Sequence, residues 1–112
     1  MTVVKSSLAE VLAKIPGAPS AQWPDGARYA LAFEQGAMSL GYYAPQGHDP
    51  QQPHARDEIY IVHAGRGAIL IDGSRHACQP GDAFFVAAGV EHRFVDFSAD
   101  FGVWVVFYGP RG

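Results

Sequence analysis

The sequence predicts an all-β fold, a closed barrel or jelly roll, with one short helix before it. Eight short runs rich in β-branched and aromatic residues follow one another between residues 28 and 108, and runs of this composition are typical of strands. Turns that contain glycine separate several of these runs, and the chain shows neither a second helical pattern nor an internal repeat. Many short strands joined by tight turns avoid exposed edges by closing into a barrel or a jelly roll.

The first element is a predicted helix over residues 6–15. Ser7 and Glu10 have the spacing of a capping box, and four residues form an apolar stripe at helical spacing: Leu8, Val11, Leu12 and Ile15. Residues 16–27 contain three prolines and two glycines, which predicts a loop. The helix and Trp23 in this loop are candidates for a cap on the barrel or for a subunit interface.

The predicted strands occupy the rest of the chain. Asp72-Gly73 is the strongest turn signal, because a two-residue hairpin needs positive φ at both central positions. A chain of 112 residues is too short for a second core, so we expect one domain over residues 1–112, with the helix and loop in 1–26 and the barrel in 27–110. The predicted strands are 28–34, 37–44, 57–64, 67–72, 74–78, 83–86, 91–97 and 101–108.

Composition narrows the classes of function. The chain is 48% hydrophobic and 17% charged, which is a globular composition. A net charge of −3 without a basic stripe argues against nucleic acid as a partner. No apolar run approaches the roughly 18 residues of a membrane span, and the N-terminus lacks the pattern of a secretory signal. Cytoplasm is therefore the expected location, and the single cysteine, Cys78, excludes an internal disulfide.

Side chains that can bind a metal gather at the start of a predicted strand. The segment "QQPHARDEIYIVHAG", residues 51–65, contains Gln52, His54 and Glu58. Gln52 and His54 project to a common side if the chain is extended there, and Pro53 favours extension at the residue before it. A second polar cluster, "PGDAFFVAAGVEHRFVD", places His92 at the start of another strand. Two histidines and one carboxylate form a donor set that binds a catalytic divalent metal and leaves positions open.

The spacing of the first cluster is Gln52-Pro53-His54, three residues, Glu58, six residues and Gly65. In this stretch the chain resembles the small single-domain cupins of the cupin-2 conserved barrel type, whose first motif reads G-x5-H-x-H-x3-4-E-x6-G. Glutamine stands at the position of the first histidine. Gly47 falls one residue away from the position of the leading glycine.

The second cluster keeps the spacing of the second cupin motif, G-x5-P-x-G-x2-H-x3-N. Gly81, Gly89 and His92 occupy its fixed positions, while Ala87 replaces the proline and Asp96 the asparagine. Two spaced motifs in the right order are more specific than either motif alone. The resemblance implies a cupin double-stranded β-helix, which is a jelly-roll barrel.

Carried over position by position, the resemblance implies a divalent metal held by four side chains: Gln52, His54, Glu58 and His92. The ion could be zinc, iron, manganese or nickel. An amide oxygen is a harder and weaker donor than imidazole, so Gln52 could bind the metal, hold a water or stand behind the other ligands. His48 is a less favoured substitute for Gln52, because Pro50 and Pro53 stiffen the chain between them. Some cupins have lost their metal, and the histidines would then only line a pocket.

The resemblance leaves two functions open. One is a metal-dependent enzyme, an isomerase or epimerase, a lyase or a dioxygenase, acting on a small organic molecule inside the barrel. The other is a non-catalytic module that binds a sugar or an organic acid. No general base is evident beyond the metal ligands, although Tyr60 and either Tyr42 or Tyr43 could offer a hydroxyl. The expected partners are a small-molecule ligand and a second copy in a homodimer, with neither nucleic acid nor membrane.

Overall fold

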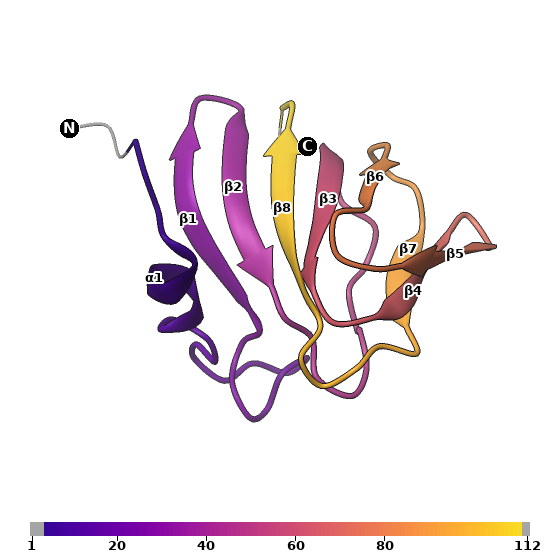
Figure 1. Cartoon of the computed structure of the whole chain (residues 1–112). Coiled ribbons are helices and arrows are strands. Elements are labelled where there is room, and N and C mark those ends of the chain that lie inside the picture. The colour runs from indigo at the N-terminus through magenta and orange to yellow at the C-terminus, as the bar shows by residue number, and fades with distance from the viewer. Residues whose placement is uncertain (1–3, 111–112) are drawn as a thin grey trace.

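The computed structural model describes residues 4–110 and confirms the predicted all-β fold with one short helix (Figure 1). Each predicted strand is present, with ends that differ by at most a few residues from the predicted ranges. None of the helices in the described part of the chain is long and apolar enough to cross a membrane. The elements are α1 (Leu8–Leu12), β1 (Tyr29–Gln35), β2 (Met38–Tyr43), β3 (Asp57–Ala64), β4 (Gly67–Ile71), β5 (Ser74–Cys78), β6 (Ala83–Val86), β7 (His92–Val95) and β8 (Gly102–Tyr108).

The strands form two antiparallel sheets. The larger sheet has the order β1-β2-β8-β3-β6, and the smaller has the order β5-β4-β7. Both sheets contribute to one apolar core, in which the larger sheet supplies Tyr60, Val62 and Val103 and the smaller supplies Ile69 and Phe94. The core therefore lies between the two sheets, as in a jelly roll.

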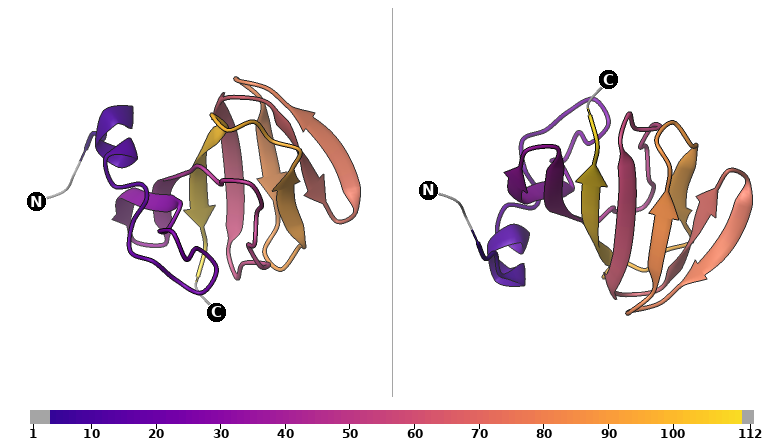
Figure 2. Two further views of the ribbon diagram at one scale, coloured as in Figure 1. Left: turned by 90° about the horizontal axis from the view of Figure 1, so that it is seen from below. Right: turned by 90° about the horizontal axis from the view of Figure 1, so that it is seen from above.

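Helix α1 is shorter than predicted and lies outside the barrel. It begins after Ser7, whose Oγ accepts a hydrogen bond from the Glu10 amide at 3.1 Å, and it ends at Leu12 rather than at residue 15. Beyond Leu12 the amides of Lys14 and Ile15 bond three residues back, to the Val11 and Leu12 carbonyls, and Pro16 disfavours the helical conformation at Ile15, so the α-helix does not continue. Figure 2 shows α1 at the opposite end of the molecule from β4 and β5.

The helix covers the outer surface of the larger sheet. Val11 is fully buried against Ala30, Tyr42 and Ala44 in a second, smaller apolar cluster. Tyr43 belongs to the main core. Adjacent residues of a strand point to opposite faces of a sheet, so Tyr42 faces outward under the helix and Tyr43 faces inward.

The hairpin between β4 and β5 confirms the predicted turn. Asp72 has φ of 48° and Gly73 has φ of 84°, and Ile71 pairs with Ser74 across the turn. Two central residues with positive φ are the requirement of a two-residue hairpin of this kind. The turn fixes the register of the smaller sheet, to which β7 adds His92 opposite Ile71.

Candidate metal centre

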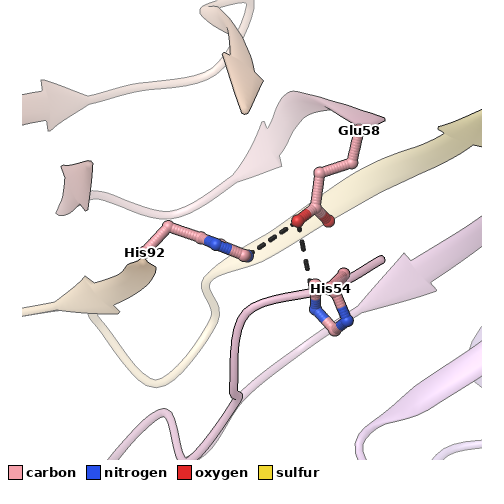
Figure 3. A group of neighbouring side chains, drawn as sticks. All are labelled: His54, Glu58 and His92. Carbon is pink, nitrogen blue, oxygen red and sulfur yellow. Dashed lines mark ion pairs between the residues drawn. The ribbon is translucent and has the colours of Figure 1, made fainter. Parts of the chain in front are cut away.

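Three of the four predicted ligands come together inside the barrel. One donor atom from each of His54, Glu58 and His92 can be chosen so that all three atoms lie within 4.8 Å of one another (Figure 3). His54 lies in the loop before β3, Glu58 in β3 of the larger sheet, and His92 at the start of β7 in the smaller sheet. The two motifs, far apart in the chain, therefore meet across the interior of the barrel.

The alternation of β3 directs Glu58 inward. Glu58, Tyr60 and Val62 are each 1% exposed, whereas Ile59 and Ile61 between them are about two-fifths exposed at 42% and 41%. The inward face thus carries one carboxylate among apolar side chains. Its position at the first inward site of the strand places it at the end of the barrel where the loop with His54 arrives.

The distances define a compact group that opens on one side. Glu58 Oε1 lies 2.7 Å from His92 Nε2 and 3.9 Å from His54 Nε2. Glu58 and His92 are buried, but 34% of the His54 side chain is exposed. His54 therefore forms the side of the group that a molecule from outside can reach.

The His92 ring is held in the tautomer that a metal ligand needs. Its Nδ1 lies 2.8 Å from the Val90 carbonyl oxygen. A carbonyl only accepts hydrogen bonds, so Nδ1 carries the proton and Nε2 is the nitrogen turned toward Glu58. Metal-binding histidines are commonly fixed by a backbone carbonyl in this way.

The polar atoms of this group lack the partners that burial demands. Within residues 4–110, no hydrogen bond of good geometry reaches Glu58 Oε1, Glu58 Oε2 or His92 Nε2, although Glu58 Oε1 and His92 Nε2 form a buried ion pair at 2.7 Å that raises the pKa of His92. A buried polar atom without a partner costs about 1–3 kcal/mol, and more when it is charged. A divalent cation would satisfy all three atoms, and imidazole with carboxylate suits zinc, iron, manganese or nickel. The residues present therefore fit a metal.

The two histidines differ in their tendency to hold a proton. Burial lowers the pKa of His54 below its usual value, and the nearby Glu58 carboxylate only partly opposes this effect. Burial also acts to lower the pKa of His92, but the Glu58 carboxylate and the Val90 carbonyl outweigh it and raise the pKa overall. His54 is thus available as a neutral ligand, whereas a metal must displace a proton from His92 when it binds.

The fourth predicted ligand, Gln52, is exposed. The neighbouring Gln51 makes the contacts: its Oε1 lies 3.2 Å from His54 Nε2 and accepts a hydrogen bond from the Tyr60 hydroxyl at 3.0 Å. Sequence reasoning missed Gln51 because the motif was read at fixed positions, and the doublet Gln51-Gln52 was the only signal of a second candidate. The role of Gln52 as a ligand stays a prediction.

A buried carboxylate behind the centre was also missed. Asp49 is 7% exposed and accepts hydrogen bonds from the Phe94 amide at 2.8 Å and from the Tyr43 hydroxyl at 2.5 Å. Phe94 lies in β7, two residues beyond His92, and Tyr43 lies at the end of β2. Asp49 therefore ties the loop before β3 to both sheets.

A cavity of about 280 Å³ lies beside the centre. His54 belongs both to the possible ligands and to the wall of this cavity. Burial raises the pKa of three wall residues above the usual tyrosine value, so that their hydroxyls stay protonated: Tyr29, Tyr43 and Tyr60. The residues that line the cavity are Tyr29, Tyr43, Gln51, His54, Tyr60, Val105 and Phe107.

Solved structures of other proteins share this fold. KdgF from Halomonas sp. is 21% identical with a TM-score of 0.65, over 74% of this chain and 78% of that one. The DMSP lyase DddQ from Ruegeria pomeroyi is 23% identical with a TM-score of 0.62, over 80% of this chain and 50% of that one. Identities this low establish the fold and leave the activity open.

Sequence comparison establishes the family. The uncharacterised protein SCO3923 of Streptomyces coelicolor is 41% identical over 89 residues, which is 78% of this chain and 84% of that protein. The family of cupin domains named Cupin_2 matches residues 39–107, a stretch that contains both motifs and all three clustered side chains. This chain therefore belongs to the cupin-2 family.

Proposed function

We propose that this cupin is a metal-dependent enzyme that acts on a small organic molecule held in the cavity beside His54. The observation that supports it most is the set of buried atoms without hydrogen-bond partners on Glu58 and His92, next to a histidine that borders the cavity. A group built only for stability would satisfy these atoms or replace them with apolar side chains.

The three side chains would hold the metal and leave its cavity side open. Bound there, a divalent metal supplies a Lewis acid that polarises an oxygen atom of the bound molecule. The cavity lies at the open side of the group, because His54 belongs both to the three possible ligands and to the cavity wall. Glu58 and His92 are the buried members of the group, so solvent would reach the metal mainly past His54.

The cavity walls indicate the class of substrate. Aromatic rings dominate the lining, and the lining residues include no lysine or arginine. Arg56 lies nearby, with its guanidinium 4.9 Å from the centre of the Phe107 ring. A cavity of this size and polarity fits a small molecule with an apolar body and an oxygen group that faces the metal.

Tyr60 is the hydroxyl best placed to assist. Its side chain points inward, and its hydroxyl bonds to Gln51 at the edge of the centre. Burial, with the Glu58 carboxylate adding to it, raises the pKa of Tyr60, so the group serves as a proton donor rather than a base at neutral pH. Tyr42, an earlier candidate, faces outward beneath α1 and is excluded from this role.

Reaction class is the open part of the proposal, and isomerisation or epimerisation, lyase and dioxygenase chemistry are its candidates. The DMSP lyase DddQ supports the lyase class to the extent that the same fold carries that reaction. Dioxygenase chemistry consumes dioxygen, whereas the other classes do not, and two histidines with one carboxylate are the donor set of many iron oxygenases. Oxygen consumption by the iron-loaded protein therefore separates a dioxygenase from the other two classes.

The test begins with the metal content of the purified full chain. We expect about one divalent ion per chain in the wild type and none in His92→Ala or His54→Ala. Loaded protein is then screened against small hydroxy acids, keto acids and sugars, with Tyr60→Phe as a variant that keeps the ring and loses the hydroxyl. Turnover that depends on the metal supports the enzyme. Binding of one of these compounds without turnover would identify the non-catalytic module instead, and a wild type that binds no metal would contradict the metal-dependent enzyme.

A further inference from the structure

We propose that Gln51, rather than the motif-aligned Gln52, supplies the fourth donor of the metal centre, and that the buried Asp49 positions it. The inference rests on the metal centre of the proposed function. It concerns the side of the centre that faces the cavity, since Gln51 lines that cavity and Gln52 is exposed.

The separation of the donor atoms fits neighbouring positions around one ion. Two donors that each lie about 2.1 Å from a metal are about 3.0–3.4 Å apart in octahedral or tetrahedral geometry. Gln51 Oε1 lies 3.2 Å from His54 Nε2, a hydrogen-bond contact within this range, whereas Glu58 Oε1 lies 2.7 Å from His92 Nε2 and 3.9 Å from His54 Nε2, on either side of it. The amide oxygen therefore lies at the spacing of a neighbouring ligand from one member of the group, His54.

Chemistry settles which end of the Gln51 amide faces the centre. Gln51 Nε2 lies 2.6 Å from Asp49 Oδ2, and a carboxylate oxygen can only accept, so the nitrogen must be on that side. The oxygen then faces His54 and accepts from the Tyr60 hydroxyl at 3.0 Å. The acceptor end of the amide points to the place where a metal would lie.

Asp49 is held in turn by groups from two strands. Its carboxylate accepts hydrogen bonds from the backbone N–H of Phe94 at 2.8 Å, the Tyr43 hydroxyl at 2.5 Å and the backbone N–H of Gln51 at 3.2 Å. Phe94 belongs to β7, the strand that also carries His92. The direction of the Gln51 side chain is thereby fixed relative to His92, the possible ligand on the smaller sheet.

Asp49 also adds charge where the metal site needs it. Two neutral imidazoles and one carboxylate compensate only part of a divalent charge, and the Gln51 amide is neutral. The Asp49 carboxylate on Nε2 polarises the amide, which makes Oε1 a better donor. Carboxylates behind a ligand act in this way in many metal sites, and their loss weakens metal binding about 10–100-fold.

The first experiment compares two adjacent glutamines. Zn²⁺ affinity is measured by competition with a chelator on the full chain, for the wild type, Gln51→Ala and Gln52→Ala. We expect Gln51→Ala to weaken Zn²⁺ binding by about 10–100-fold, and Gln52→Ala to change it less than about twofold. The inference is overturned if Gln52→Ala causes the loss, or if Gln51→Ala binds Zn²⁺ like the wild type.

A third variant separates this inference from the proposed function. If His92→Ala abolishes Zn²⁺ binding and Gln51→Ala leaves it intact, only the role of Gln51 fails. If His92→Ala binds Zn²⁺ as tightly as the wild type, the metal centre itself fails, and the inference with it. The absorption spectrum of the Co²⁺-loaded protein adds an independent readout, because replacement of an amide ligand by water in Gln51→Ala alters it.

The positioning role of Asp49 is tested by a double-mutant cycle. Asp49→Asn should weaken Zn²⁺ binding severalfold or more in the wild type and should have no further effect in Gln51→Ala, since it acts through that residue. Tyr43→Phe, which removes one donor to Asp49, should show the same dependence with a smaller loss and serves if Asp49→Asn does not fold. Additive losses in the two backgrounds would overturn the positioning role, because a purely structural effect does not depend on Gln51.

Discussion

Glu58 and Val62 point into the same interior from one strand, four residues apart, and each is 1% exposed. Val62 pairs with Val103 across the sheet and packs in the same apolar core as Phe101. None of these three side chains has a polar group that needs a hydrogen-bond partner. Glu58 has two carboxylate oxygens without hydrogen-bond partners in the described chain. One strand thus contributes to two ends of the barrel. At the packed end, around Val62, apolar side chains fill the interior; at the reactive end, around Glu58, buried polar atoms lack hydrogen-bond partners, as is typical of functional sites.

The packed end is closed by aromatic rings. Phe101 lies 5.0 Å from Phe94 and 5.7 Å from Phe97, measured between ring centres. Gly65, at the end of the first motif, lies so close that an added Cβ would be 2.6 Å from the Phe101 Cα. The reactive end instead keeps a cavity of about 280 Å³ and a partly exposed histidine. Stability and function are therefore separable by mutation.

The largest change is expected from Glu58→Gln. The variant removes the carboxylate, which is the only negatively charged ligand among the three. Loss of a residue that only orients a ligand weakens metal binding about 10–100-fold, so loss of this ligand should weaken it by more than about 100-fold. The metal-free protein should lose about 1–3 kcal/mol of unfolding free energy, because the ion pair with His92 is lost while the amide of similar shape keeps the packing and can donate to a neutral His92 Nε2. Metal titration and urea unfolding measure the two effects. Retained metal binding in a folded variant would contradict the assignment of Glu58.

Phe101→Ala should show the opposite pattern. Removal of a buried phenylalanine costs about 3–5 kcal/mol of unfolding free energy, while metal affinity of the folded protein should stay within a few-fold of the wild type. Phe85→Ala is the matched control, since Phe85 is 61% exposed and should cost less than about 0.5 kcal/mol. Urea unfolding of both variants tests this. Loss of metal binding in folded Phe101→Ala would show that the two ends are coupled.

Two glycines sharpen the contrast at a smaller scale. Gly73 has positive φ and open space around it, so Gly73→Ala should cost only the backbone term, about 1 kcal/mol. Gly65 also has positive φ, and a side chain there would additionally meet the Phe101 backbone, so Gly65→Ala should cost clearly more. Thermal unfolding of the two variants gives the comparison. Equal losses of stability in the two variants would mean that the backbone around Phe101 shifts enough to make room for the added methyl group.

The sequence was most informative where structure follows local rules. The alternation of β3 and the Asp72-Gly73 turn depend on adjacent residues, and both were predicted correctly. The helix was predicted too long because its apolar stripe continues to Ile15. That residue packs in the same cluster as Val11 although it lies outside the helix. An apolar stripe indicates which residues pack against the rest of the protein, and this packing can continue past the residue at which helical hydrogen bonding ends.

The candidate site was predictable only in part, for a related reason. His54, Glu58 and His92 follow spaced motifs, and the strands bring them together as the resemblance implied. Gln51 and Asp49 lie in a loop without periodicity, where no pattern shows which side chain turns inward. Their contacts depend on the Phe94 amide and on Tyr43, which are distant in the chain. Such positions become visible only in three dimensions.

The smallest change is expected at Cys78, a potentially reactive group that lies in the packed core. Its side chain belongs to the main apolar cluster, and burial, with Asp82 adding to it, raises the pKa of the thiol from 9.0 to about 11. A raised thiol pKa favours the neutral form in the folded state, so its contribution to stability is complete below pH 9 and is lost as the pH rises through about 11. At pH 8 the thiolate fraction is about a hundredfold lower than in the unfolded chain. Iodoacetamide at pH 8 should therefore leave the folded protein almost unlabelled and modify it fully in urea, with and without metal alike. Rapid labelling of the folded protein would place Cys78 outside the packed end, and labelling that slows only when metal binds would assign it to the reactive end instead.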